Sequence, residues 1–596
     1  MVQFSLDMIT TKQIIVKEIK KIVKDLTNQD IVPALEHPKD ERHGDYSTNI
    51  ALTLFAKLKA KSQKSKVGRP IDLAREIAKI LNTSYLIPNT LSRIEVVAPG
   101  FINFWLSEDY LTALMIPIIR VKDGYGRSEL LANKKIMVEF TDPNPFKEFH
   151  IGHLYSNIVG ESLSRLLESQ GAEVWRVCYQ GDVGLHVAKA LYAVLSSKFK
   201  VQSSKLEKES LINKIKTLGQ AYALGVKAYE EDESAKKEIE KINKEVYEEN
   251  SSIMEIYKKG RAWSLEYFDS IYKRLGTKFK RFYFESEAGK IGLEIVKKNI
   301  GKVFKKSDGA IIFPGEKYGL HNRVFINSLG LPTYEAKDLG LAATKYKDFP
   351  YDLSIIITAT EQSDYFKVVL KALSLIEPDL ARKTKHISHG VVRLPIGKMS
   401  SRTGTIITGE WILDEAKKRI RERYKEMDDM VGEMVAVGAV KYALLKSGIG
   451  KDLSFDFDES ISLEGNSGPY LQYTFARTRS VLAKVKSHPD KVGTKVKSDW
   501  KFDPTSWRMK LEIEESSLLK SLHRFPEVVG EAAEQFAPNL LCNYLFDLAQ
   551  KFNLFYQKHK ILESSNKEFR LALTMAVGQV IKNGLYLLGI KAPQRM

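Results

Sequence analysis

The sequence predicts three domains: a central α/β domain built on a parallel sheet, a small α+β domain before it and an all-α domain after it. The α/β prediction rests on residues 135–179, where an apolar run, a helical repeat and a second apolar run follow one another. The all-α prediction rests on the chain after residue 465, whose apolar residues recur at helical spacing. We place the domains at 1–118, 119–464 and 465–596, with a helical insertion in the second at about residues 196–275.

The composition is that of a soluble globular protein with excess positive charge. The chain has 596 residues, too many for one core, and 43% of them are hydrophobic and 28% charged. Lys and Arg exceed Asp and Glu by 92 − 74 = 18, compatible with a polyanionic partner or with a generally Lys-rich proteome. The two cysteines lie far apart, and signal-peptide and membrane-spanning patterns are absent from the sequence. We therefore expect a reduced, cytoplasmic protein without zinc or a membrane partner.

Residues 1–118 read as the small α+β domain. Residues 14–26 are amphipathic, residues 43–49 (HGDYSTN) form a turn that leads into a helix, and residues 94–104 are strand-like around a Pro-Gly turn. Residues 57–69 carry six basic residues and few apolar ones. That segment is a solvated loop or an edge that faces phosphate.

The central βαβ unit places two histidines at the start of its helix. Pro143 and Pro145 end the strand at 135–140 because proline cannot donate to a sheet ladder. The helix begins at His150, and His153 shares its first turn, where free N–H groups favour phosphate. With Gly152 between them, the histidines suit a nucleotide. A surface pair and two metal ligands are the alternatives, although neither HExxH nor a Cys pair accompanies them.

The string from residue 139 to 160, EFTDPN…HIGHLYSNIVG, resembles class I aminoacyl-tRNA synthetases, and arginyl-tRNA synthetases in particular. The resemblance implies a Rossmann-type catalytic domain that uses ATP with Mg²⁺ to convert L-arginine into arginyl-adenylate and pyrophosphate. It then implies transfer of arginine to the 3′-terminal adenosine of tRNA(Arg), first to the 2′-hydroxyl, by an enzyme that is most often monomeric. HGDYSTN and residues 98–106 (APGFINFWL) resemble the family's N-terminal domain, which contacts the outer corner of the tRNA.

The next segments contain one turn that could bind a ligand and one long stretch without an assigned function. Residues 180–184 (QGDVG) follow the second strand, and Gly181 and Gly184 make this turn a bed for a ribose or base, with a simple turn as the alternative. Residues 196–275 are dominated by Lys and Glu and read as long solvated helices, to which we assign no chemistry.

The arginine site is predicted from polar residues after two later strands. Residues 324–329 and 352–358 (DLSIIIT) are strand candidates, and the second is typical of a buried parallel strand. Tyr334 and Asp338 are one helical turn apart and share a face, which by itself is most often a surface pair. The family resemblance puts Glu139, Tyr334 and Asp338 at the guanidinium and Asn144 and Gln362 at the α-amino and carboxylate groups.

A basic loop follows the strand predicted at residues 386–394. It reads PIGKMSSRTG and is similar to the second class I signature, although a basic surface loop is the alternative. Lys398 could reach the β- and γ-phosphates. The family-wide form has a second lysine where Ser401 stands, and Lys147, three residues before His150, occupies a position thought to compensate. The predicted catalytic residues are His150, His153, Lys398 and Lys147, and the predicted ATP site adds Gly152, Gly181, Asp182, Met399, Ser400 and Ser401.

The last domain resembles the helical anticodon-binding domain of the same family. Its first amphipathic helix carries Tyr470, Tyr473 and Arg477, which we predict to bind tRNA, while core packing is the alternative for the tyrosines. Further helices are predicted at 511–522, 539–559 and 569–588.

Four alternative proteins fit the sequence less well. A small nucleotidyltransferase with a HIGH motif needs neither flanking domain. A cysteinyl synthetase would show zinc-ligand cysteines, and a glutamyl synthetase would need cations in place of Glu139 and Asp338. A non-catalytic tRNA-binding relative would be expected to lose the HIGH motif or Lys398, and both are present.

Overall fold

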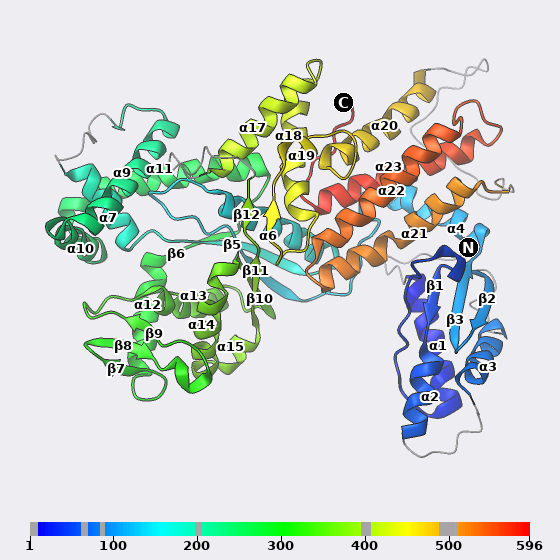
Figure 1. The fold of residues 1–596 in the computed structure, drawn as a ribbon, viewed down its shortest axis with the longest axis horizontal. Coiled ribbons are helices and arrows are strands. Elements are labelled where there is room, and N and C mark those ends of the chain that lie inside the picture. Colours follow the sequence, from blue (N-terminus) through cyan, green and yellow to red (C-terminus); the bar gives the residue numbers. More distant parts are fainter. Residues whose placement is uncertain are drawn as a thin grey trace.

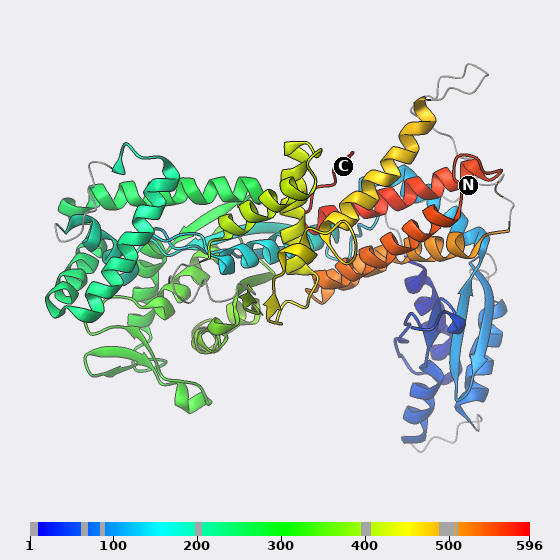
Figure 2. The same cartoon turned by 45° about the horizontal axis from the view of Figure 1, so that its top comes forward.

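A computed structural model describes residues 10–60, 69–83, 90–196, 206–394, 407–487, 507 and 510–596 of the protein. In Figures 1 and 2 the C-terminal helices lie between the N-terminal sheet with its helices and the central sheet. One continuous core contains residues of all three parts. The predicted fold class is confirmed. No helix in the described ranges combines the length and the apolar character that a membrane span requires.

The N-terminal part is a three-stranded antiparallel sheet packed against helices. The strand order is β1-β3-β2, and Thr10 caps the first helix by accepting a hydrogen bond from the N–H of Gln13, so that this helix begins before residue 14, where the sequence placed it. Of the basic segment 57–69, residues 61–68 lie outside the described part. The elements are α1 (Thr11–Thr27), β1 (Tyr46–Thr48), α2 (Ile50–Ala60), α3 (Pro70–Thr83), β2 (Leu91–Val97), β3 (Phe101–Leu106), α4 (Glu108–Ala113) and α5 (Met115–Val121).

The central sheet has five parallel strands in the order β11-β10-β4-β5-β6. The chain runs outward from β4 to β6 on one side and continues with β10 and β11 on the other, so the order reverses between β4 and β10. Ligands of open α/β sheets bind outside the carboxyl ends of the strands at such a reversal. The strands are β4 (Lys135–Glu139), β5 (Glu173–Gln180), β6 (Arg281–Phe284), β10 (Leu353–Ala359) and β11 (Thr384–His389).

Two of the predicted strands differ from the strands in the structure. The run at 324–329 corresponds to β9 (Arg323–Ile326), which pairs with β8 (Ala310–Phe313) and β7 (Lys305–Ser307) in a separate antiparallel sheet. The run at 386–394 is broken at Gly390, where an added Cβ would lie 2.1 Å from the carbonyl oxygen of Lys451. The chain then forms β12 (Val392–Arg393), which pairs with β13 (Leu453–Ser454).

Helices cover the central sheet and extend from it. The charged segment 196–275 includes three helices with buried apolar residues such as Ile239 and Ile242, so it is not only a solvated surface. The helices of this part are α6 (Ile151–Ser169), α7 (Leu185–Leu195), α9 (Leu211–Glu231), α10 (Glu233–Tyr247), α11 (Ser251–Leu275), α12 (Glu285–Lys298), α13 (Tyr334–Asp348), α14 (Ser363–Ile376), α15 (Pro378–Arg382), α17 (Gly409–Arg423), α18 (Asp429–Leu445) and α19 (Phe457–Ser460).

The C-terminal part is a helix bundle. The sequence ended one helix at residue 522, but it continues through Pro526 because Phe525, Val528 and Val529 pack into the core, which outweighs the hydrogen bond that proline removes. The helices are α20 (Gly468–Ser487), α21 (Ile513–Glu534), α22 (Pro538–Lys558) and α23 (Lys567–Leu587).

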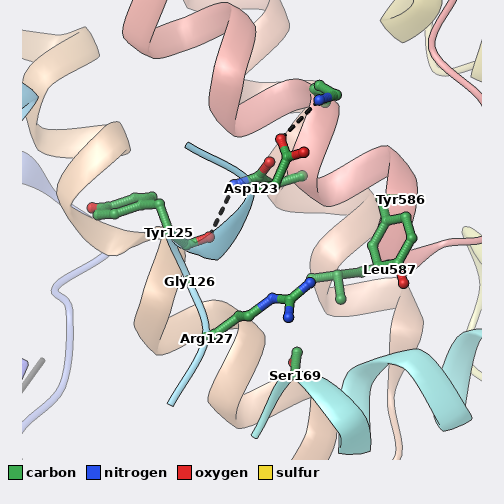
Figure 3. A pocket seen from close by; sticks show the side chains of 9 residues that line it. Asp123, Tyr125, Gly126, Arg127, Ser169, Tyr586 and Leu587 are labelled. Atoms are coloured by element: carbon green, nitrogen blue, oxygen red, sulfur yellow. Dashed lines mark hydrogen bonds and ion pairs between the residues drawn. The ribbon is translucent and has the colours of Figure 1, made fainter. Parts of the chain in front are cut away.

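The bundle also joins the chain that leads into the catalytic domain. Lys582 of α23 forms an ion pair with Asp123 at 2.7 Å, and the side-chain amide of Asn583 donates to the carbonyl of Tyr125 at 3.0 Å. A cavity of about 170 Å³ lies at this junction. Figure 3 shows Arg127 extending across it toward Leu587 and Tyr586.

Candidate active site

The first turn of α6 holds its two histidines in one arrangement. His150 caps the helix, its Nδ1 accepts from the N–H of His153 at 3.4 Å, and the Nδ1 of His153 accepts from the N–H of His150 at 3.3 Å. Because Nδ1 is an acceptor in both rings, the proton of each neutral ring lies on Nε2. Burial lowers the pKa of His150 to about 4 and the pKa of His153 well below its usual range. The turn therefore presents two neutral N–H donors.

Two neighbours support that turn. Gly152 has no side chain, and an added Cβ would come within 3.1 Å of the His150 ring. Lys147 lies over the ring of Tyr222 at 4.3 Å, and after burial its charge is the next cause that lowers the pKa of His150. The charge of Lys147 thus acts on both histidines, and its catalytic role stays a prediction.

The loop between β4 and α6 adopts an uncommon backbone conformation. Thr141 and Asp142 have φ of 82° and 45°, the left-handed region that few non-glycine residues occupy. Three hydrogen bonds hold them: Thr141 N–H donates to Ser156 Oγ at 2.9 Å, Asn157 donates to Thr141 Oγ1 at 2.9 Å, and Tyr179 N–H donates to Asp142 Oδ1 at 2.7 Å. Helix α6 and strand β5 therefore fix this loop.

A cavity of about 520 Å³ lies where β4 and β10 end, and we call it the carboxylate cavity. All five residues predicted to bind arginine line it, from three separate stretches of the chain: Glu139, Asn144, Tyr334, Asp338 and Gln362. The sequence reasoning missed its other lining residues, which are Asp142, Tyr179, Arg323, Glu335, Thr358, Glu361, Tyr365 and Phe366.

The carboxyl groups in the cavity differ in their partners. Glu139 is paired with Lys345 at 2.5 Å, and both side chains are at most 4% exposed. Asp338 accepts a hydrogen bond from the hydroxyl of Tyr365 at 2.5 Å, while burial raises the pKa of Asp338 to about 8. Glu139 therefore has one oxygen already engaged, which the sequence did not predict, and Asp338 has no cation paired with it among the described residues.

The predicted turn at 180–184 has a structural function. An added Cβ at Gly181 would lie 2.2 Å from Oδ1 of Asn144, so glycine is what lets the Asn144 side chain reach its position. Asp182 is 1% exposed and accepts from Arg261 Nε at 3.0 Å and from the Ser286 N–H at 2.9 Å and hydroxyl at 2.8 Å. Its carboxylate is occupied by α11 and α12, and its predicted contact with ATP stays a prediction.

The second signature cannot be placed. Lys398, Met399, Ser400 and Ser401 lie outside the described residues. Where the description resumes, the Ile407 carbonyl accepts from the N–H of Ile151 at 3.2 Å and Thr408 forms a bridge with His150. The chain after the loop is thus attached to the first turn of α6.

The three predicted tRNA-binding residues meet on α20. Arg477 donates to the hydroxyl of Tyr473 at 3.2 Å and to Asn553, and its guanidinium lies over the ring of Tyr556 at 5.1 Å. The Asn553 amide donates to the hydroxyl of Tyr470 at 2.9 Å. Tyr470, Tyr473 and Arg477 therefore form one cluster with two residues of α22 that the sequence reasoning did not select.

For some site residues that the sequence reasoning did not select, the sequence did contain a pattern that places them near the predicted arginine-binding residues. Lys345 lies seven residues after Asp338, which is two turns along the same helix face. Tyr365 lies three residues after Gln362 at the start of α14. For Asp142 the sequence offered only its place in the proline-bounded turn.

Three family models together match most of the chain. "tRNA synthetases class I (R), catalytic domain" matches residues 115–457, "Arginyl tRNA synthetase N terminal domain" residues 10–106, and "DALR anticodon binding domain" residues 471–596. A protein of Borreliella burgdorferi named arginine–tRNA ligase is 32% identical, over 96% of this chain and 99% of its own. One of Treponema denticola with the same name is 32% identical over 98% of both chains.

Two solved structures share the fold. The arginyl-tRNA synthetase of Thermus thermophilus superposes with a TM-score of 0.77 at 23% identity, covering 98% of this chain and all of its own. That of Plasmodium falciparum gives a TM-score of 0.74 at 21% identity and covers both chains fully.

Proposed function

The chain belongs to the arginyl-tRNA synthetase family of class I, and we propose that it performs the reaction of that family with the residues gathered at the carboxyl edge of its central sheet. It is an arginine–tRNA ligase, which activates arginine with ATP and charges tRNA. The observation that carries the assignment of residues is the carboxylate cavity, which lies at the reversal of strand order and is reached by the loop that leads into the first turn of α6.

In our proposal the carboxylate cavity binds arginine. A planar guanidinium needs carboxylates placed for paired hydrogen bonds, which Asp338 and the second oxygen of Glu139 supply, with Tyr334 beside them. Asn144 and Gln362 hold the α-amino and carboxylate groups. A neutral analogue would leave the buried carboxyls without a partner, so the cavity discriminates without an editing step.

The first turn of α6 holds the triphosphate of ATP in this proposal. The Nε2–H groups of His150 and His153 donate to phosphate oxygens, and Lys147 adds positive charge. Lys398, with Met399, Ser400 and Ser401, would add a second cation from the loop outside the described residues. Gly152 and Gly181 keep the approach open, and Mg²⁺ enters with ATP.

The chemical steps need positioning rather than covalent participation of the protein. The arginine carboxylate attacks the α-phosphorus of ATP and pyrophosphate leaves with the electron pair of the broken bond. The 2′-hydroxyl of the terminal tRNA adenosine then attacks the carbonyl carbon, loses its proton, and AMP leaves. Fixed donors at the α- and β-phosphates stabilise the developing charge.

The remaining domains bind tRNA(Arg) in this proposal. The cluster of Tyr470, Tyr473 and Arg477 is partly exposed and offers rings for stacking and a guanidinium for phosphate. The N-terminal domain contacts the outer corner of the tRNA. We further propose that the protein acts as a monomer in the cytoplasm.

The deciding experiment is ATP–pyrophosphate exchange with each amino acid, with and without total tRNA. We expect exchange with arginine alone, and only when tRNA is added, as in most members of the family. Exchange with another amino acid would contradict the assignment of Glu139, Tyr334 and Asp338. A complete lack of exchange would favour a non-catalytic tRNA-binding protein.

A further inference from the structure

We propose that Asp142 is a specificity-determining residue that binds the guanidinium of arginine together with Asp338. This inference rests on the proposed function of the carboxylate cavity and adds a carboxylate to it. Asp142 lines the cavity, and its position in the chain, between Glu139 and Asn144, puts it amid the residues assigned to arginine.

One oxygen of Asp142 is fixed and the other is available. Oδ1 accepts the N–H of Tyr179 at 2.7 Å, which holds the carboxyl at the end of β5. Within the described ranges, no side chain or N–H donates a hydrogen bond to Oδ2. A carboxylate that is anchored by one oxygen and open at the other is oriented before the ligand arrives, which lowers the cost of binding.

The left-handed backbone at Thr141 and Asp142, unusual for the β-branched Thr141, aims the Asp142 side chain. Asp142 follows Thr141 in the left-handed region, and Ser156 and Asn157 of α6 hold Thr141 there through hydrogen bonds. Strained non-glycine residues persist where the surroundings determine them completely, and they gather at ligand sites. Here the strain turns the chain so that a carboxylate faces the cavity just before the phosphate-binding helix begins.

No cation is paired with Asp142 among the described residues. The charge of Lys345 reaches it, but Lys345 is bonded to Glu139, and Arg323 in the cavity lining is paired with Glu335. On β4 the charge of Glu139 is balanced by Lys345 of α13, and Asp338 of the same helix adds a further carboxyl. The facing groups on β5 and α11 are Cys178, Tyr179 and Tyr272, none of them cationic. Burial raises the pKa of the Asp142 carboxyl well above its usual range, and the charge of Glu139 raises it further. A guanidinium would supply the missing positive charge.

A second observation indicates a polar ligand at this place. The hydroxyl of Tyr179 is buried and has no hydrogen-bond partner, although Tyr179 lines the same cavity. The carboxyls of Asp338 and Glu139 lie near this hydroxyl. Buried hydroxyls are nearly always paired, so the unpaired one marks a place in the cavity where a ligand completes the hydrogen bonding.

The test replaces Asp142 by asparagine and by glycine. Asparagine keeps an oxygen for the Tyr179 N–H and tolerates the left-handed backbone, and glycine removes the strain altogether, so the two variants carry different risks for folding. Both lose the charge. The readouts are KM for arginine and for ATP in tRNA charging, and the inhibition constant of citrulline, which has a neutral ureido group in place of the guanidinium.

We expect D142N and D142G to raise KM for arginine about tenfold or more, to leave KM for ATP within twofold, and to weaken discrimination against citrulline by a similar factor. Asp308→Asn is the matched control, because Asp308 also has a left-handed φ, of 48°, but lies in the β7–β8 turn away from the cavity lining. It should change none of these values.

Two results would overturn the inference. Either KM for arginine stays within twofold in both variants, or it rises with unchanged discrimination against citrulline, which would place Asp142 at the α-amino group. Failure of the underlying function is separate, because the wild-type protein would then not charge tRNA with arginine. If Asp338→Asn raised KM for arginine and D142N did not, the cavity would still be assigned to arginine, but Asp142 would not belong to the binding residues.

Discussion

At the scale of single residues, the candidate site combines the neutral donors of two histidines with the carboxyl of Asp338, which has no paired cation among the described residues. His150 and His153 have lowered pKa values and are uncharged near pH 7, whereas burial raises the pKa of Asp338 to about 8. The histidines therefore donate hydrogen bonds without titrating in the physiological range, and the carboxyl does titrate there. The pH dependence near neutrality should accordingly belong to the binding of arginine rather than of ATP.

Tyr365→Phe tests whether the pH dependence near neutrality comes from the binding of arginine. The carboxyl of Asp338 is protonated below its raised pKa of about 8, so KM for arginine should fall as pH rises from 7 to 9. The Tyr365 hydrogen bond lowers that pKa, and without it the fall should move to higher pH. We expect KM for arginine at pH 7.5 to rise about tenfold with little change in kcat.

The control for this variant is Tyr346→Phe. Tyr346 accepts from Lys383 and lies toward the far end of α13, away from the cavity lining. Equal effects of the two variants, or a profile in Tyr365→Phe that keeps its midpoint, would contradict the positioning of Asp338 by Tyr365.

His150→Asn tests the donors of the first turn. Asparagine is a good N-cap, so helix α6 should keep its start, but the Nε2–H donor is lost. Removing one donor from developing charge costs about a hundredfold to a thousandfold in kcat, and we expect a loss of that size in pyrophosphate exchange. Ser107→Asn makes a similar cap exchange at α4 in the N-terminal part. If the His150 variant kept full activity, the first turn would not hold the phosphates.

At the scale of elements, the order of strands determines where the site forms. Because β4 and β10 are neighbours and lead in opposite directions, their carboxyl ends are free of crossover helices. Glu139, at the end of β4, and Gln362, which follows β10, therefore line the same cavity. They are 223 positions apart in the sequence (362 − 139).

Local sequence patterns predict the strand and the helix that position the site. The contacts between distant segments depend on tertiary packing. The strand before His150 and the helix after it follow from apolar periodicity and proline placement, and the structure has both. The sequence shows that Lys345 shares a helix face with Asp338, but the pairing of Lys345 with Glu139 depends on how α13 packs against the sheet, which no local pattern encodes. The break at Gly390 has the same origin, because the close carbonyl belongs to Lys451, 61 residues away (451 − 390).

Asp182→Ala decides between two functions of Asp182: contact with ATP, which the sequence predicted, and the anchoring of α11 and α12, which the structure shows. Its carboxylate holds α11 through Arg261 and α12 through Ser286, so its loss should cost about 3 kcal/mol in the free energy of unfolding. Urea unfolding measures that loss, and KM for ATP should stay within about threefold. A large rise in KM for ATP at unchanged stability would instead support the direct contact with ATP that the sequence predicted.

At the scale of the whole molecule, the C-terminal bundle connects the N-terminal domain to the catalytic domain. Glu527 of α21 accepts a hydrogen bond from the Tyr46 hydroxyl at 2.5 Å and lies 3.0 Å from Nε2 of His37. On the other side, α23 is tied to Asp123 and to the chain around it. The position of the N-terminal domain, visible below α21 in Figure 1, therefore depends on contacts made by the bundle rather than by the sheet.

Glu527→Ala should loosen that position and weaken the binding of tRNA. The substitution leaves Nε2 of His37 without its partner and removes one of the two partners of the Tyr46 hydroxyl, which keeps Nε2 of His523. A buried group that loses its partner costs about 1–3 kcal/mol. If the N-terminal domain contacts the tRNA corner, part of that cost appears in KM for tRNA, which we expect to rise about fivefold to tenfold while KM for arginine is unchanged. Glu531→Ala is the control, because Glu531 lies one turn further along α21, is exposed and is bonded to Gln535. Equal KM values for tRNA in the two variants would mean that this junction does not set the distance between the two tRNA-binding domains, whereas a rise confined to Glu527→Ala would make α21 the element that sets it.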